Sequence, residues 1–326
     1  MYKNIVTGLL LIVAASLAAT PLRAAEPKNC QLKQYAALDL SELPNGSLLV
    51  PVTIQESRAF MILNTASAFS TIMESAVSRL GLQTQRVPFG VQVNSASRPI
   101  ENLATANGFS LGNVQFKRVD FLETPNDAIG ANPDDAQVIG VLGMDVFSHF
   151  DLELDIANRK LKVFSPDHCP GHAVYWTDKY DSVPIRFGKL GEFYFPMELD
   201  GKKIETTLAA GNRTTTLSTD VTRKLFNFDK NSPDMESETD PAGRTTVHYR
   251  AMKLSGEGLQ IINAHITLID RPQSACRLGS EAGAAAYDGC FGVHPLQLGR
   301  NVLAKLRIYI ATKEKVLYFT PAEASK

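Results

Sequence analysis

Two short turns carry the residues whose types and spacing could do chemistry. One is Asn64-Thr65-Ala66, which follows the apolar run "FMIL", and the other is Ala209-Ala210-Gly211, which follows "TTL". An asparagine can hold a water molecule and donate a hydrogen bond, but its amide has no useful basicity near neutral pH. Ala209 offers only a methyl group. The two turns therefore lack a residue that could activate water or return a proton.

The chain around these turns repeats itself. A shift of 145 residues places residues 48–80 over residues 193–225 without a gap, so that Leu63 falls on Leu208. Both segments read as a strand, a tight turn, a second strand, another turn and a short helix. A register without gaps over this length favours an internal duplication over two unrelated β domains.

A second pair of matching segments closes each half. Residues 140–164 resemble residues 296–319, with Gly143 falling on Gly299. Each segment reads as an apolar strand, a glycine, a short amphipathic helix and a hairpin with the period-two alternation of strands. We therefore expect two copies of one mainly β unit, in residues 25–170 and 171–326, joined by a linker near residues 168–184.

On these residues the chain resembles the aspartic proteases, specifically the bacterial retropepsin-like group that has two lobes on one chain. The resemblance is carried by "ILNTASAFSTI" and "TLAAGNRTTTL", and by the later "VLG" (141–143) and "QLG" (297–299). In that family the turn is Asp-Thr-Gly, and the later segment crosses beneath it in a ψ-shaped loop. The resemblance implies a mainly β, two-lobed acid-protease fold, double-psi β-barrel-like, with a few short helices.

The departures from the family pattern decide the expected activity. Two aspartates of the family share a proton, and together they activate a water and polarise the scissile carbonyl. Asn64 and Ala209 stand where the resemblance expects these acids, which implies a pseudopeptidase with no catalytic residue. The resemblance further implies that Thr65 braces the two lobes through its hydroxyl, and that Ala210 cannot reciprocate. Ala66 replaces a glycine of the motif, so a local change of the backbone is expected there.

Other acids are weak candidates for a replacement. Asp145 follows the first "VLG", where a helix cap or a solvated helix start is expected. Asp120, Asp151 and Asp155 lie in strand-like runs and are expected to face outward. An active aspartic-type endopeptidase that uses non-standard carboxylates stays open as an alternative, and so does a purely structural scaffold.

A cleft between two β lobes can be retained when its catalytic acids are lost. In the family an extended peptide lies there as a strand, held by backbone hydrogen bonds and side-chain pockets. We expect residues 64–66 and 209–211 to form the cleft floor and to bind a peptide or an exported protein segment. A covering flap is expected in residues 89–108, with its second-half counterpart in residues 243–256. Tyr249 in that counterpart is a possible stacking residue, but packing in the core or on the surface is the preferred interpretation.

The start of the chain has the features of an export signal. Lys3 precedes an apolar run, residues 5–19, and Leu22-Arg23-Ala24 suits cleavage after Ala24. Residues 1–24 are therefore expected to be a signal peptide, and the product to be periplasmic or secreted, without a membrane span and monomeric. The formal net charge of −1 and the absence of a basic run argue against nucleic-acid partners.

Four cysteines in an exported chain predict two disulfides. Of the three possible pairings, the preferred one joins Cys30 to Cys169 and Cys276 to Cys290. A metal site at "HCPGH" (168–172) is the alternative, but it has no fourth ligand nearby. Neither a metal nor a cofactor is expected.

Overall fold

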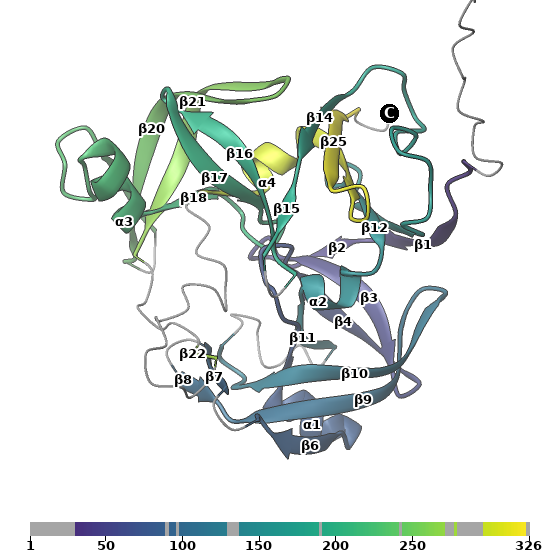
Figure 1. Cartoon of the computed structure of the whole chain (residues 1–326). Helices are drawn as coiled ribbons and strands as arrows, with labels where there is room; N and C mark the ends of the chain where they lie inside the picture. Colours follow the sequence, from purple (N-terminus) through teal and green to yellow (C-terminus); the bar gives the residue numbers. More distant parts are fainter. Residues whose placement is uncertain are drawn as a thin grey trace, which may run out of the picture.

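The computed structural model describes residues 30–88, 91–95, 98–128, 137–188, 191–240, 243–270, 277–278 and 296–323. The expected signal peptide and the Cys276–Cys290 disulfide lie outside these residues. The described part is dominated by β-strands, arranged as two lobes beside a shared sheet (Figure 1). In this view the first half lies in the lower part, the second half at the upper left and the shared sheet at the upper right. The predicted fold class, a two-lobed acid-protease fold with a few short helices, is confirmed.

The first lobe is built on an eight-stranded sheet within the described residues, in the order β2-β3-β4-β11-β5-β10-β9-β6. A further pairing of β3 with β9 closes the sheet on itself. The elements of this lobe are β2 (Ser41–Glu42), β3 (Leu48–Ile54), β4 (Ser57–Leu63), β5 (Thr71–Met73), α1 (Glu74–Leu80), β6 (Gln83–Arg86), β9 (Asn102–Leu111), β10 (Val114–Thr124), β11 (Val138–Leu142) and α2 (Met144–Phe147).

The second lobe repeats this plan with a matching strand order, β15-β16-β17-β23-β18-β21-β20-β19, again counted over the described residues. Its elements are β15 (Arg186–Phe187), β16 (Phe193–Leu199), β17 (Lys202–Leu208), β18 (Thr215–Ser218), α3 (Thr219–Val221), the π-helical turn η1 (Thr222–Phe226), β19 (Glu236–Thr239), β20 (Thr245–Gly256), β21 (Leu259–Ile269), β23 (Leu296–Leu298) and α4 (Arg300–Leu303).

The two lobes share their registers as well as their strand order. The pair that closes the first sheet is Thr53 opposite Ser110, and the pair that closes the second is Glu198 opposite Ser255. Each residue of the second pair lies 145 positions after its counterpart, so the shift found for residues 48–80 extends to Ser110 and Ser255. The apolar side of these strands faces a common core, since the period-two burial of β16 runs from Phe193 to Leu199.

A six-stranded sheet joins the two halves within the described part of the chain. Its order is β1-β13-β12-β24-β25-β14, and β12 of the first half pairs antiparallel with β24 of the second. The strands are β1 (Gln34–Asp39), β12 (Asp151–Asp155), β13 (Lys160–Phe164), β14 (Asp181–Pro184), β24 (Leu306–Ala311) and β25 (Val316–Pro321). The hairpins predicted after each "apolar-apolar-Gly" segment are β12–β13 and β24–β25.

The expectation that Asp151 and Asp155 face outward is wrong. Their exposed fractions are 0% and 7%, whereas Asp120 is exposed as predicted. The reason is that β12 lies in the middle of the six-stranded sheet. The polar face of β12, which carries Asp151 and Glu153, is covered by the linker that follows β13. A strand with one solvated face was assumed, and this strand is buried on both.

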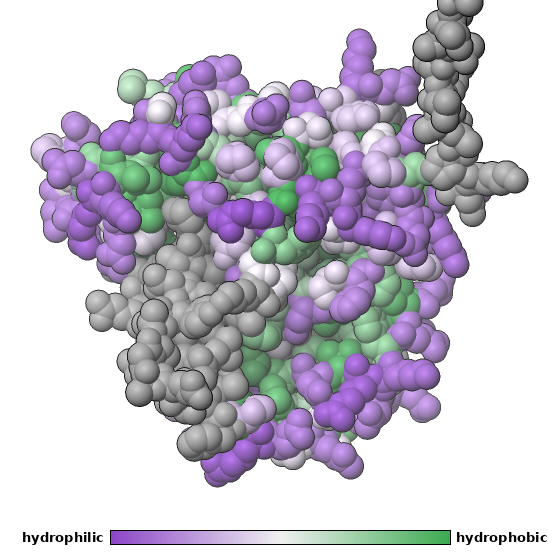
Figure 2. Space-filling view, in the orientation of Figure 1, coloured by the Kyte–Doolittle hydropathy of each residue, from purple (hydrophilic) through white to green (hydrophobic). Residues whose placement is uncertain are grey.

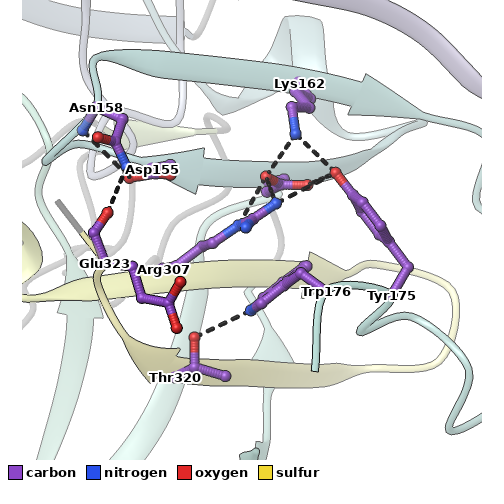
Figure 3. A network of polar contacts seen from close by, with 9 residues as sticks. Asp155, Asn158, Lys162, Tyr175, Trp176, Arg307, Thr320 and Glu323 are labelled. Atoms are coloured by element: carbon purple, nitrogen blue, oxygen red, sulfur yellow. Dashed lines mark hydrogen bonds and ion pairs between the residues drawn. The ribbon is translucent and has the colours of Figure 1, made fainter. Parts of the chain in front are cut away.

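A network of charges fastens the linker to this sheet. Glu153 is 1% exposed, and its carboxylate accepts hydrogen bonds from Lys162 Nζ at 2.9 Å, Arg307 Nη2 at 2.8 Å and the Tyr175 hydroxyl at 2.7 Å. Figure 3 shows the side chains of Lys162, Arg307 and Tyr175 converging on one place. The guanidinium of Arg307 also lies 4.1 Å from the ring centre of Trp176. Two linker aromatic residues are thereby held on the shared sheet.

A disulfide and a buried ion pair hold the start of the linker. Cys30 and Cys169 are bonded, with 4.9 Å between their Cα atoms, which is the preferred pairing. His168 donates from Nε2 to Asp151 at 2.7 Å, and its Nδ1 lies 2.9 Å from the Cys169 carbonyl oxygen. Because both partners of the imidazole are acceptors, both ring nitrogens must carry a proton. With Cys169 oxidised and His168 paired, the "HCPGH" segment has lost two of its three candidate metal ligands.

We expect Glu153→Gln to lower the free energy of unfolding by about 3–5 kcal/mol, because Lys162 and Arg307 lose a buried counter-charge. Urea unfolding followed by circular dichroism measures this change. The matched control is Glu205→Gln, which removes an exposed ion pair with Arg186 and is expected to cost at most about 1 kcal/mol. Equal effects of the two substitutions would contradict the importance of the network.

The pair of His168 and Asp151 predicts a stability that depends on pH. The hydrogen bond to the Asp151 carboxylate raises the pKa of His168 above its ordinary value, although burial opposes this. The stabilisation is therefore complete below about pH 6.5, the unfolded-state pKa, and is lost as the pH rises through the raised pKa. The unfolding free energy of the native protein should exceed that of His168→Gln most at pH 6 and least at pH 9. The exposed His172 provides the control, His172→Gln, for which no such trend is expected.

Candidate functional site

The two turns singled out in the sequence meet at the midline between the halves. Thr65 is 1% exposed, and its hydroxyl donates to the Leu208 carbonyl oxygen at 2.8 Å. The same hydroxyl accepts the Ala210 N–H at 3.0 Å. A Cβ on Gly211 would lie 3.0 Å from Cγ of Asn64, so only glycine fits without displacement there. The structure thus brings the predicted floor residues together, with the expected one-sided brace from Thr65.

Each turn rests on the strand that crosses beneath it. The Asn64 N–H donates to the Leu142 carbonyl oxygen at 3.0 Å, and the Ala209 N–H donates to that of Leu298 at 2.9 Å. These are the "VLG" and "QLG" segments, and each pairs parallel with the strand that leads into the turn. Asn64 and Ala209 therefore occupy equivalent places, and the Asn64 side chain accepts the Ala66 N–H at 3.1 Å.

The glycine that ends each crossing strand is required by close packing. A Cβ on Gly143 would lie 2.6 Å from the carbonyl carbon of Phe69, and one on Gly299 would lie 2.2 Å from that of Thr214. Both distances are shorter than any carbon–carbon contact, and the obstacle is backbone. The two glycines that carried the resemblance thus allow the crossing strand to reach the turn.

Asp145 supports the first turn from below and does not face it as an acid. Its carboxylate accepts the Ser70 hydroxyl at 2.6 Å and the Ser70 N–H at 2.9 Å. Asn301 holds the equivalent place in the second half, where it accepts both groups of Thr215. Burial raises the pKa of Asp145, and the hydrogen bonds from Ser70 oppose that shift. The expected solvated helix start is wrong, although Asp145 does accept the N–H of Val146 in the same helix.

A cavity opens beside the midline on the side of the second lobe. Its volume is 420 Å³. Residues from both halves line it, namely Asn45, Ser47, Gly211, Asn212, Arg213, Thr214, Thr216, Ile269, Gln297 and Arg300. The sequence analysis identified the floor of the cleft but missed this wall. Arg213 and Gln297 lie within the segments that carry the resemblance, but not at the residues that define the motif, and Arg300 follows the second segment.

The expected flap region forms a hairpin in the first half. Within residues 89–108, β7 (Val91–Ser95) pairs with β8 (Arg98–Ile100), and β7 also pairs with β22 (Arg277–Leu278) from the second half. The second-half region 243–256 is instead the long strand β20, which corresponds to β9 and belongs to the lobe's main sheet. Polar side chains cover most of the face in Figure 2, and apolar surface shows near its middle.

Tyr249 packs within the second lobe. Its ring lies 4.5 Å from that of Phe228, centre to centre, and its hydroxyl donates to Asp200. Packing, the preferred interpretation of this residue, is therefore confirmed. Across the part of the chain with described positions, no group of three or more metal-ligating side chains is found, and no helix has the length and apolarity to cross a bilayer.

Comparison with known proteins bears on the first half most directly. Residues 50–146 match the family model of aspartyl proteases. No curated protein matches the sequence. Two plant seed proteins of known structure align at low identity. Conglutin gamma, a basic 7S globulin of lupine, has 12% identity and a TM-score of 0.45 over 89% of this chain and 95% of its own. Basic 7S globulin from soybean has 10% identity and a TM-score of 0.49 over 90% and 96%.

We expect Thr65→Val to destabilise the protein by about 2–4 kcal/mol, because the Leu208 carbonyl and the Ala210 N–H would both be buried without a partner. Thermal and urea unfolding measure the loss. Thr65→Ser is the matched control, since it keeps the hydroxyl and removes one methyl group, worth about 1 kcal/mol. If serine and valine cost the same, the hydroxyl does not join the two halves.

Proposed function

We propose that the chain is an aspartic-protease-like protein in two-lobe form, and that it is a pseudopeptidase that binds an extended peptide between its lobes without cleaving it. The fold and the family match support the coarser part of this proposal. The finer part depends on the residues at two equivalent places in the midline turns.

The observation that carries the proposal is the equivalence of Asn64 and Ala209. Each donates its N–H to the crossing strand, and the turns around them are joined through Thr65. In the family these places hold the two aspartates, one of which must be ionised and the other protonated for water to attack the carbonyl. An amide and a methyl group can do neither. The carboxylate of Asp145, which lies near the first turn, accepts hydrogen bonds from Ser70.

The proposal includes export of the protein. The apolar run in residues 5–19 after Lys3 supports a signal peptide, and the Cys30–Cys169 disulfide suits an oxidising compartment. The peptide partner would accordingly be an exported protein segment. A bound strand would find its backbone partners between the hairpin of β7 and β8 and the floor formed by the two turns.

The test measures binding and cleavage on the same purified protein. A statine-type peptide is expected to raise the melting temperature and to bind by calorimetry. An unfolded substrate such as reduced casein should stay uncleaved from pH 3 to pH 7, because no residue at the midline can activate water. Cleavage that the statine peptide inhibits would overturn the loss of activity. A protein that neither cleaves nor binds any extended peptide would overturn the binding role.

The double variant Asn64→Asp with Ala209→Asp supplies the matched comparison. Two carboxylates at these places would share a proton, so we expect hydrolysis at acid pH that the statine peptide blocks. Either single variant should stay inactive, since one carboxylate cannot act as both acid and base. Activity of a single variant equal to that of the double variant would contradict the assignment of the two places.

A further inference from the structure

The cavity beside the midline has an unusual chemical lining. Apart from Gly211 and Ile269, the described residues that bound its 420 Å³ have side chains that can donate hydrogen bonds, and none of them is acidic. It begins at Gly211, which touches Asn64, so it continues directly from the floor of the cleft. A peptide lying across the floor would therefore place a side chain or its end into this cavity.

The internal repeat shows that this lining is peculiar to the second half. By the registers of the two repeated segments, Arg213 corresponds to Ala68, Gln297 to Val141 and Arg300 to Met144. Ala68 and Met144 are fully buried and apolar. Equivalent positions of one duplicated unit thus carry apolar side chains in one lobe, and two guanidinium groups and an amide in the other. At these positions the two lobes have the same strand pairing, since Val141 pairs with Ile62 and Gln297 pairs with the equivalent Thr207.

Two of the polar groups have donors to spare. Gln297 accepts Asn212 Nδ2 at 2.8 Å and Thr216 Oγ1 at 3.3 Å through its Oε1, which leaves its two N–H groups for another acceptor. Arg213 is exposed on the wall of the cavity, and no ion pair to its guanidinium is found among the described side chains. Asp270, which follows the lining residue Ile269, does not neutralise it, because Asp270 pairs with Lys230.

Arg300 builds the back of the cavity and ties it to the first half. It is 8% exposed, and its Nη1 donates to Glu42 at 3.1 Å. A Cβ on Gly46 would lie 2.6 Å from its Nη2, so the guanidinium lies directly against the turn that presents Asn45 and Ser47. Its Nε is enclosed and has no hydrogen-bond partner among the described residues. The positive charge at the open side of the cavity comes from Arg213.

We infer that this wall is a carboxylate-binding subsite, so that the cleft takes extended peptides that carry an acidic side chain or a free C-terminus at this place. The inference rests on the proposed peptide-binding function and specifies its ligand. A guanidinium and an amide with free N–H groups match the two oxygens of a carboxylate, and such charge-assisted hydrogen bonds are stronger than neutral ones. A peptide with a free C-terminus or an acidic side chain at this place would accept hydrogen bonds from these donors. A neutral peptide of the same shape would leave the donors unpaired.

The experiment uses blocked octapeptides of alanine, valine and threonine. A single Glu or Gln is moved through the positions, and a second series compares a free C-terminus with an amide. By calorimetry at low salt, the Glu peptide should bind about ten-fold more tightly than its Gln partner at one position. The series with the stronger preference separates an acidic side chain from a terminal carboxylate. The preference should weaken in 0.5 M salt.

Variants assign the preference to the cavity. Arg213→Gln should remove the difference between Glu and Gln peptides, and Arg213→Glu should favour a Lys peptide instead. Arg58→Gln is the matched control, since Arg58 is exposed on β4 and does not line the cavity, and it should leave the preference unchanged. Equal binding of Glu and Gln peptides at every position would overturn the subsite and leave the peptide-binding function standing.

A second measurement separates the two proposals if no peptide binds. Succinate and the neutral succinamide are titrated into protein labelled with ¹⁵N-arginine, and the Nε–H signal of Arg213 is followed. A shift with succinate alone would support the subsite while the peptide-binding role falls. Absence of any shift would overturn both.

Discussion

The hydroxyl group of Thr65 is the contact on which the site depends. It joins the loop of one half to the loop of the other by donating to Leu208 and accepting from Ala210, and it does so in a buried place where neither partner can turn to water. A pseudo-symmetric protein would hold two such threonines, and this chain holds one. The single brace still fixes Asn64 beside Gly211, because the crossing strands beneath the turns carry the rest of the geometry. The floor of the cleft is therefore set by backbone hydrogen bonds and two close glycines, and its shape does not require the acids of an active enzyme.

Because these contacts do not involve the side chains of a catalytic pair, the fold is compatible with the proposed loss of catalysis. Two carboxylates at a midline repel one another and must be kept partly desolvated, which costs stability. An amide and a methyl group at Asn64 and Ala209 carry no such cost. The supports that lie one layer deeper, the Ser70–Asp145 pair and the Thr215–Asn301 pair, still hold the start of each following strand. Asp145 differs from its counterpart Asn301 in having an ionisable side chain. Burial raises the pKa of this carboxyl group. Because the Asp145 carboxylate accepts hydrogen bonds from both the N–H and the hydroxyl of Ser70, this residue has a structural role.

The sequence could predict the features that follow from the internal repeat, but few of the contacts between the two halves. Three features follow from the register of the repeat in the sequence. They are the strand order, the ψ-shaped crossings and the contact between residues 64–66 and 209–211. Asp151 and Asp155 were misjudged because alternation reveals one buried face of a strand, whereas the linker that buries the other face comes from a distant segment. Arg213, Gln297 and Arg300 were overlooked for a related reason. Each is unremarkable in its own segment, and only the fold gathers them around one cavity. A comparison of each half with the other would have found them, since Ala68, Val141 and Met144 stand in their places.

The asymmetry between the two walls of the cleft agrees with the proposed loss of catalysis. An enzyme gains rate only from interactions that strengthen in the transition state, so tight binding of the ground state brings it no advantage. A protein that holds a peptide without cutting it has no transition state to favour, and every contact with the bound ligand contributes to affinity. In the proposed subsite, the exposed guanidinium of Arg213 would be a contact of this kind, because it would distinguish ligands by charge. Under this proposal, one half of the duplicated unit keeps an apolar wall for packing, and the other half uses the equivalent positions to recognise a ligand.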